Sequence, residues 1–345
     1  MMKPSVRAMC GVASVMLCGG LASACSSSDS GSSHATLTLY SGQHEQTTEA
    51  LVAGFTKATG IKVDIRSDNE AVLAQLISTE GGKSPADLFF TENSPPLMSL
   101  QGRGLLAPVD AAVLAAVPAK FDSPDGHWVG VSARVATLIY NTDALQPGNV
   151  PTSILDLADP KWKGKLGISP GETDFQSIVA AISTSQGADA ALTWLKDVKA
   201  NGSAHNYSDN EGLVAGVNKG QAQIGVINSY YWYRFVKESG ADKVKSAVSY
   251  FAPGDVGYVV DVSGIGVLQS SKHKAEAERF VAFVVGPVGE AIVAASSSFE
   301  YPVGSGVAAS PTVRPFAELK PNTLTIADLG DGSGTLELLQ KAGLL

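Results

Sequence analysis

Cysteine, histidine and tryptophan are scarce in this chain of 345 residues, which contains 3 Cys, 5 His and 4 Trp. Two of the cysteines, Cys10 and Cys18, lie in an N-terminal segment that we expect to be removed, so we expect no disulfide in the remaining chain. The shortage of thiols and imidazoles also disfavours a zinc site. Apolar cores must hold the fold, and a chain with 44% hydrophobic residues has ample material for them.

Basic residues are outnumbered, 25 to 33, which gives a formal net charge of −8. An acidic surface repels phosphate backbones, so nucleic-acid binding is disfavoured. No repeat of 20–50 residues is visible, which disfavours a solenoid. The length suggests two domains of about 150 residues each.

The apolar, uncharged run Ala8–Leu21 follows the basic residues Lys3 and Arg7. It is too short for a permanent membrane span, and this arrangement is typical of an export signal. We therefore predict a signal peptide at residues 1–24. An α/β protein of two parts, exported from the cytoplasm, is the expectation from composition and pattern together.

The signal ends in Leu-Ala-Ser-Ala followed by Cys25, which resembles a bacterial lipobox. The resemblance implies that Cys25 becomes the acylated first residue of the mature chain, whose acyl chains anchor it stably outside the cytoplasmic membrane. The alternative is an ordinary signal peptide in which Cys25 is incidental. The Ser-rich residues 25–35 predict a flexible tether, so membrane contact would be through the lipid anchor only.

Strand and helix patterns alternate along the rest of the chain. The order β-α-β-α-β over residues 36–90 predicts a parallel sheet with right-handed crossovers, and ligands in such sheets lie beyond the carboxyl ends of the strands. A second α/β region follows. The expected strands are 36–40, 62–66, 86–90, 135–140, 165–168, 222–227 and 259–267, and the expected helices are 46–59, 70–78, 175–185, 188–199, 210–218 and 274–285.

Chemically reactive side chains follow three of these strands. They are His44, Glu92 and the adjacent pair Tyr230 and Tyr231. A hard, highly charged cation prefers oxygen ligands and tolerates one imidazole. Phenols ionise at neutral pH only beside strong positive charge, which Fe³⁺ supplies and Ca²⁺ and Mg²⁺ usually do not. The set therefore predicts a ferric site whose occupation releases phenolic protons.

Each of these residues also has an ordinary structural explanation when it is taken alone. His44 could cap the helix that begins nearby, and Glu92 could be a solvated loop acid. Tyr230 and Tyr231 could belong to a packed aromatic cluster or to a platform on which a sugar stacks. Only their joint occurrence favours the ferric interpretation.

Three segments, YSGQH at 40–44, DLFFTE at 87–92 and INSYYW at 227–232, carry the joint occurrence. In this order and at this spacing they resemble the bacterial ferric-iron-binding proteins of ABC transporters, which are periplasmic binding proteins of type II. The resemblance covers most of residues 36–315. It implies a non-enzymatic, monomeric receptor that hands Fe³⁺, or a ferric chelate, to a permease and its ATPase.

The resemblance also assigns residues. It implies that His44, Glu92, Tyr230 and Tyr231 bind the metal and that Arg134 supports the glutamate. A synergistic anion, phosphate or carbonate, would fill the remaining coordination positions, held by the amides of Asn93, Asn210 and Asn228. One departure concerns the anion: the run from Ser169 to Asp174 contains two carboxylates that would repel it.

The fold that the resemblance implies has two α/β lobes joined by two hinge strands, with the ligand cleft between the lobes. The chain would leave the first lobe near Arg134 and return near Asp261. We therefore predict one lobe from 36–133 plus 261–311 and the other from 134–260 plus 312–345. Closure about the hinge would let the metal bridge both lobes.

Other functions stay open at this stage. The nearest alternative is the same fold binding another small solute, such as a phosphonate, a polyamine, sulfate or a sugar. A lipid-anchored hydrolase is disfavoured because the mature chain contains no G-x-S-x-G or H-E-x-x-H motif and no reactive cysteine. An adhesion or structural lipoprotein would not need the paired tyrosines.

Overall fold

The computed structural model describes residues 35–202, 205–304 and 306–345. The predicted signal peptide and Cys25 lie outside the described residues, as does all of the predicted tether except Ala35. No helix in the described ranges is long and apolar enough to cross a membrane.

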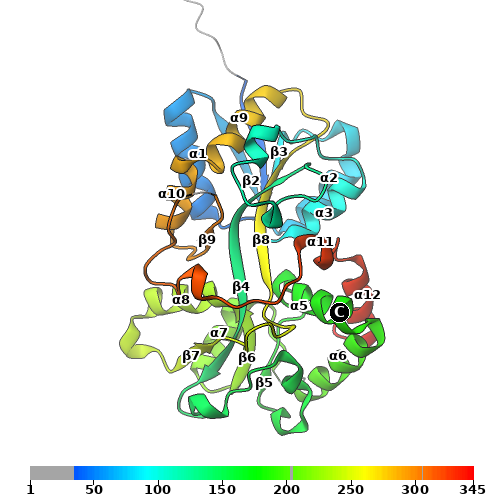
Figure 1. Cartoon of the computed structure of the whole chain (residues 1–345), viewed down its shortest axis with the longest axis vertical. Helices are drawn as coiled ribbons and strands as arrows, with labels where there is room; N and C mark the ends of the chain where they lie inside the picture. The colour runs from blue at the N-terminus through cyan, green and yellow to red at the C-terminus, as the bar shows by residue number, and fades with distance from the viewer. Residues whose placement is uncertain (1–34, 203–204, 305) are drawn as a thin grey trace, which may run out of the picture. The chain divides into compact units, whose positions relative to one another are not determined.

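The described chain is built on a mixed sheet of nine strands flanked by helices (Figure 1). The strands are β1 (Leu37–Ser41), β2 (Val63–Ser67), β3 (Leu88–Thr91), β4 (Val129–Asn141), β5 (Leu166–Gly167), β6 (Ile224–Asn228), β7 (Ser246–Ser249), β8 (Val260–Val267) and β9 (Tyr301–Pro302). The helices are α1 (Glu45–Thr59), α2 (Glu70–Glu80), α3 (Ser94–Gly102), α4 (Ala111–Leu114), α5 (Thr173–Gln186), α6 (Ala188–Gly202), α7 (Asn210–Asn218), α8 (Ser229–Ser239), α9 (Lys274–Val284), α10 (Pro287–Ala295), α11 (Ile326–Leu329) and α12 (Ser333–Ala342).

The strand order is β2-β1-β3-β8-β4-β6-β5, with β7 and β9 also pairing with β4. The first three strands are parallel, as the β-α-β-α-β pattern predicted, because α1 and α2 provide the crossovers between them. β8 then runs antiparallel between β3 and β4. This mixed α/β architecture confirms the predicted fold class.

Two long strands run through the middle of the sheet. β4 pairs with β8 over its first half and with β6 over its second half, so it belongs to both ends of the sheet. Arg134 and Asp261, the two residues at which the predicted hinge crosses, are register partners in β4 and β8. The division into lobes remains a prediction, which this pairing supports.

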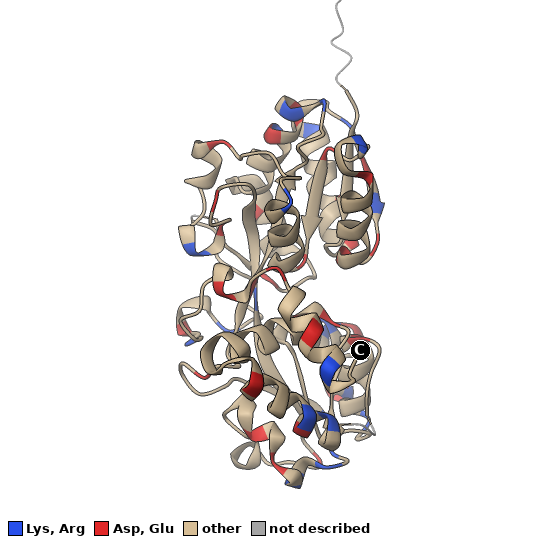
Figure 2. Cartoon of the chain, turned by 90° about the vertical axis from the view of Figure 1, so that its right-hand side faces the viewer, with Lys and Arg blue, Asp and Glu red and all other residues tan. Residues whose placement is uncertain are grey.

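Helices cover both faces of the sheet at each end (Figure 1). At the end formed by β1, β2 and β3, α1 packs on α9 and α10, and the rings of Phe55 and Phe280 meet edge to face at 5.0 Å. At the other end, α5, α6 and α12 pack together and α7 packs on α8. Acidic and basic residues are interspersed over these helices and loops (Figure 2).

Several elements begin and end where local chemistry requires. Gly60 ends α1 with φ 76°, the left-handed conformation in which glycine is favoured. Pro287 begins α10, because a proline in the first turn loses no helical hydrogen bond. The sequence did not predict the strands β7 and β9 or the helices α3, α4, α8, α10, α11 and α12.

Candidate metal centre

His44 immediately precedes α1, in the short loop that follows β1. Its side chain makes no capping hydrogen bond to the helix, so the capping role is not observed. Instead its Nδ1 lies 2.8 Å from Oε1 of Glu92, and the side chain is only 10% exposed. Gly42, two residues earlier, lets the loop after β1 pass close to the start of α2, because a Cβ at Gly42 would lie 2.5 Å from Cβ of Glu70.

Glu92 follows β3 and connects the predicted ligands. Its Oε2 accepts hydrogen bonds from the hydroxyl of Tyr230 at 3.3 Å and from Nη1 of Arg134 at 3.4 Å. Burial alone would raise the pKa of Glu92, but the charges of His44 and Arg134 outweigh it and lower the pKa to about 2. Glu92 is therefore ionised at neutral pH. The idea of a solvated loop acid does not fit, since its side chain is 19% exposed.

Tyr230 and Tyr231 occupy the first turn of α8, directly after β6. Helical backbone there places both adjacent phenols on one side, and their rings stack with centroids 4.1 Å apart. The Tyr230 ring also meets the His44 imidazole edge to face at 5.1 Å. Three of the four predicted ligands are thus in mutual contact, and Tyr231 stacks on the third.

Both phenols are protonated in the absence of a cation. Burial raises their pKa values well above 10, and the negative charges of Asp174 and Glu92 raise them further. A multiply charged cation between the phenols and Glu92 would reverse this effect, because it favours the ionised forms. The site is therefore suited to a cation that can displace phenolic protons.

Unpartnered buried atoms surround the same point. Nε2 of His44 is buried without a hydrogen-bond partner, and so is Oδ1 of Asp174. A buried polar atom without a partner is costly unless something absent from the structure satisfies it, and a neutral imidazole nitrogen is a common metal ligand. Among the described residues, no group of three or more His, Cys, Asp or Glu forms a metal site, so such a site here needs the tyrosines.

Arg134, in β4, lies behind the predicted ligands. It is fully buried, and its guanidinium lies 5.4 Å from the centre of the Tyr230 ring. Beside the hydrogen bond to Glu92 it forms an ion pair with Glu300, just before β9. Sequence reasoning did not find Glu300, because the residue lies 208 positions from Glu92 and belongs to none of the three segments that carried the resemblance.

Two of the three predicted anion-binding amides have protein partners. Nδ2 of Asn93 donates to Oε1 of Glu70 at 3.0 Å, and Nδ2 of Asn210 donates to Oδ2 of Asp174 at 3.0 Å. Asn228 stands at the N-terminus of α8, and its side chain makes no capping hydrogen bond. Carboxylates of the chain therefore accept from two of the three amides.

The carboxylates on this side are crowded. Burial, followed by repulsion from Asp174, raises the pKa of Glu172 to about 8. Burial also raises the pKa of Asp174 to about 7, although Arg134 opposes the shift. Burial and the charge of Glu92 likewise raise the pKa of Glu70 to about 7. With these pKa values the three groups are fully ionised only above about pH 8, so the repulsion of an added anion that the run from Ser169 to Asp174 suggested applies fully only there.

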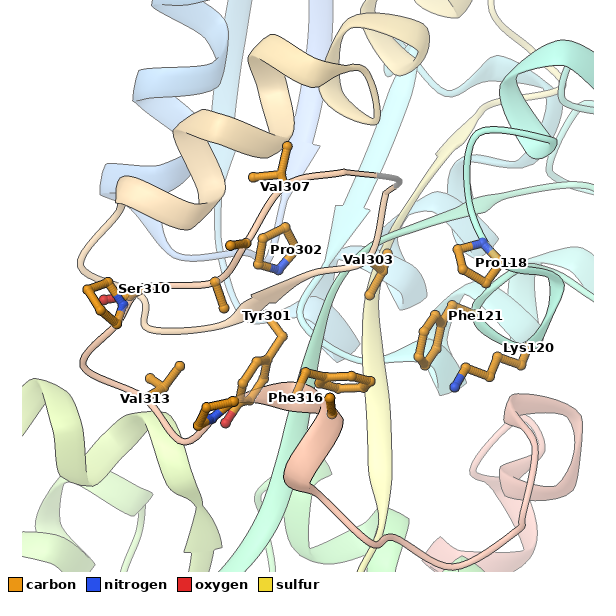
Figure 3. A pocket seen from close by; sticks show the side chains of 15 residues that line it. Pro118, Lys120, Phe121, Tyr301, Pro302, Val303, Val307, Ser310, Val313 and Phe316 are labelled. Carbon is orange, nitrogen blue, oxygen red and sulfur yellow. The ribbon is translucent and has the colours of Figure 1, made fainter.

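A separate cavity of about 750 Å³ lies beside β9 and the segment 307–317 (Figure 3). Its lining is largely apolar, with Tyr301, Phe316 and Phe121 around it and Lys120 at one side. None of the four predicted metal ligands lines this cavity. The candidate centre is therefore the polar cluster around Glu92.

Known proteins resemble the chain over most of its length. Residues 83–322 match the family model described as bacterial extracellular solute-binding protein. The Fe(3+)-binding periplasmic protein of Serratia marcescens is 39% identical over 309 residues, which cover 90% of each chain.

Solved structures agree with the sequence relatives. Iron-bound HitA from Pseudomonas aeruginosa has 42% sequence identity and a TM-score of 0.85, over 89% of this chain and 99% of that one. The Trichodesmium protein IdiA (FutA), in complex with iron and citrate, has 30% identity and a TM-score of 0.79, over 90% and 99% of the two chains.

The expectation that the chain is not an enzyme is confirmed by these relationships, because its family and relatives are solute-binding proteins. They equally confirm a location outside the cytoplasmic membrane, in agreement with the predicted export. The chain belongs to the bacterial extracellular solute-binding proteins, in the family of the ferric iron-binding periplasmic proteins.

Proposed function

We propose that this protein binds Fe³⁺ through His44, Glu92, Tyr230 and Tyr231 and delivers it to an ABC transporter. The contact of Glu92 with His44, Tyr230 and Arg134 carries the proposal, because it gathers residues from positions 44 to 230 at one point. The iron-binding relatives at 39% and 42% identity support the same conclusion.

Charge balance favours a trivalent ion. Glu92 supplies one negative charge before binding, and Tyr230 and Tyr231 supply two more once they lose their protons. Together these charges match Fe³⁺, and the remaining ligand, His44, contributes a neutral nitrogen. Because the ligands come from both ends of the sheet, the ion links α1 and β3 to α8, which favours a closed arrangement of the protein.

We also propose a co-bound anion, phosphate or carbonate, at the iron. Four protein ligands leave two positions of an octahedron free, and the citrate present in the Trichodesmium complex supports an oxygen-donor anion there. Asn228 and the second N–H of Asn93 and of Asn210 are the donors we propose for it. The anion would have to share those amides with Glu70 and Asp174.

The membrane attachment is proposed from the sequence. We infer that Cys25 carries the lipid and that residues 25–35 tether the binding domain to the membrane, close to the permease and its ATPase. Incorporation of labelled palmitate into the wild-type chain, and its loss in Cys25→Ala, is the expected result in cells. Export of an unlabelled wild-type chain would contradict the anchor.

A spectroscopic titration tests the iron site. Adding ferric nitrilotriacetate to the purified protein should produce a visible charge-transfer band from tyrosinate to Fe³⁺. The band should vanish in the double variant Tyr230→Phe/Tyr231→Phe. Tyr233→Phe/Tyr250→Phe is the matched control, because it also removes two tyrosine hydroxyls. These two hydroxyls lie 3.4 Å from each other, and neither contacts Glu92.

The wild-type result decides the proposal. A wild-type protein that stays colourless with excess ferric nitrilotriacetate would exclude the tyrosinate site and leave another small solute as the ligand. A band that survives in Tyr230→Phe/Tyr231→Phe but is lost in the control variant would place the iron elsewhere.

A further inference from the structure

Arg134 creates an electrostatic problem for a cation-binding site. Its guanidinium is fully buried, and it contacts Glu92, the carboxylate proposed to bind the metal. Two positive groups that share one buried carboxylate repel each other strongly, since little water is present to screen them. A ferric ion at Glu92 therefore needs a second acid that neutralises Arg134.

Glu300 is the acid in position to do this. Its side chain is entirely buried, and its Oε1 pairs with Nη2 of Arg134. Its Oε2 accepts from the hydroxyl of Ser132 at 3.0 Å and from Nε2 of Gln43 at 3.3 Å. Both oxygens are thus held, which is the condition under which a buried carboxylate is tolerated.

The contacts of Glu300 also extend to His44, a second predicted ligand. Gln43 directly precedes His44, and its Oε1 accepts a hydrogen bond from the backbone N–H of His44 at 2.7 Å. Its Nε2 also donates to Ser263 in β8 at 2.6 Å. Glu300 is therefore linked to Glu92 through Arg134 and to His44 through Gln43.

The backbone beside Glu300 is strained. Phe299 has φ 57°, the only positive φ at a non-glycine residue in the described part of the chain. Such a conformation costs free energy in a bulky residue and persists only where the surroundings impose it. Phe299 is itself buried, and its ring lies 6.1 Å from that of Tyr233. This packing holds the strained backbone that positions Glu300.

We propose that Glu300 is a positioning residue of the ferric site, which neutralises Arg134 and so leaves Glu92 free to bind the metal. This inference rests on the proposed function. Without the negative charge of Glu300, Arg134 would have Glu92 as its only paired carboxylate and would compete with the ion for it. Iron would still reach the two phenols, but it would bind more weakly.

The variant Glu300→Gln tests the role, because the amide is nearly isosteric and removes only the charge. Ferric nitrilotriacetate should still produce the tyrosinate band. Competition with citrate should show iron affinity about tenfold to hundredfold below wild type, as for other residues that orient metal ligands. Glu290→Gln is the control for placing an amide at a buried glutamate. Burial raises the pKa of Glu290 to about 8, so at pH 7 this change removes a proton rather than a charge and should leave the iron affinity unaltered.

A double variant separates charge from structure. Glu300→Gln/Arg134→Gln removes both charges together, so its iron affinity should recover to within about threefold of wild type, a coupling that independent structural damage would not produce. If Glu300→Gln does not fold, Glu300→Asp, which keeps the charge but shortens the reach, should show the same loss to a smaller degree.

The outcomes distinguish the two proposals. Wild-type affinity in Glu300→Gln, or a double variant as weak as the single one, would overturn the role of Glu300 and leave the ferric site intact. A colourless wild-type protein would overturn the ferric site itself, whatever the variants show.

Discussion

The two sides of the candidate centre differ in how they carry charge. On the side of α1 and β3, the pKa of Glu92 is lowered to about 2, because His44 and Arg134 outweigh the effect of burial. On the side of α8, burial and the nearby carboxylates raise the pKa values of Tyr230 and Tyr231 well above 10. One side is ionised and paired before any cation arrives, whereas the other stays neutral until one binds.

This difference separates capture from selection. An ionised carboxylate attracts any cation, but deprotonating two buried phenols requires a cation of high charge. The protonated side therefore discriminates against Ca²⁺ and Mg²⁺, which gain too little from phenolate to offset the cost of its formation. Protons released on binding report directly on the contrast.

The largest expected effect is on the pH dependence of iron binding. Since both phenols are protonated without iron and ionised with it, they alone should release two protons on binding, which makes the intrinsic affinity rise at least about hundredfold per pH unit. Proton release in weakly buffered solution, measured as ferric nitrilotriacetate is added and corrected for the chelator, checks the number. Tyr231→Phe should release one proton fewer. If wild type and Tyr231→Phe released the same number of protons, Tyr231 would not ionise on iron binding.

The next effect concerns the stability of the iron-free protein. Burial raises the pKa of Asp174 to about 7 in the folded state, so this group contributes most below the unfolded value near 4 and its contribution is lost as pH rises towards 7. Asp174→Asn keeps an acceptor for Asn210 but does not titrate. Relative to wild type, it should gain about 2–4 kcal/mol in unfolding free energy between pH 4 and pH 8.

Denaturant unfolding at the two pH values measures this gain. Asp189→Asn, in the first turn of α6 and exposed, is the control and should show no such difference. If Asp174→Asn changes stability equally at both pH values, the buried carboxyl does not carry the expected cost.

A smaller effect is expected from Glu92→Gln on the ionised side. The amide can still accept from Tyr230, but a metal ligand and its charge are lost. Iron affinity should therefore fall by at least the roughly tenfold to hundredfold that is typical of residues that only orient metal ligands, while the tyrosinate band persists. In the wild type, the lowered pKa of Glu92 stabilises the folded state, and this stabilisation is lost as pH falls from about 4.5, the unfolded pKa, towards 2. The variant Glu92→Gln should not show this acid-dependent loss of stability. Citrate competition and acid unfolding measure the two changes. An unchanged affinity would exclude Glu92 as a ligand.

The smallest effect concerns Asp261, which links the two sides of the candidate centre by hydrogen bonds. Asp261, in β8, accepts hydrogen bonds from the hydroxyl of Ser94 in α3 at 2.6 Å and from that of Ser177 in α5 at 2.7 Å. Ser177→Ala should lower the unfolding free energy by about 1–2 kcal/mol, because the hydrogen bond goes to a charged acceptor. Ser183→Ala, in the same helix and more exposed, should be near neutral in the same denaturant experiment. Equal losses in both variants would show that Asp261 gains nothing from Ser177.

The sequence predicted the local elements of the first region well. The expected strands 36–40, 62–66 and 86–90 appear as β1, β2 and β3, each within about two residues. Their alternation with amphipathic helices is a local property, visible in adjacent residues. The two-residue strand β9 and the edge strand β7 were missed, since they are short and are defined by pairing with β4 rather than by their own pattern.

The candidate site shows the same division. His44, Glu92, Tyr230 and Tyr231 could be selected from the sequence, because unusual residue types stand at strand ends in a recognisable order. Their contacts could not be known, and neither could the engagement of Asn93 and Asn210 by Glu70 and Asp174. Those hydrogen bonds join residues that lie 23 and 36 positions apart.

Composition, short-range pattern and the order of a few residue types along the chain were enough to indicate export, an α/β fold and a set of ligands suited to a hard cation. Only the folded chain decided which charges face one another: that Arg134 stands between Glu92 and Glu300, that His44 pairs with Glu92 instead of capping α1, and that carboxylates crowd the phenols. The physical reason is that electrostatic interactions depend on distance and burial, and both are set by long-range packing of strands that the sequence keeps far apart.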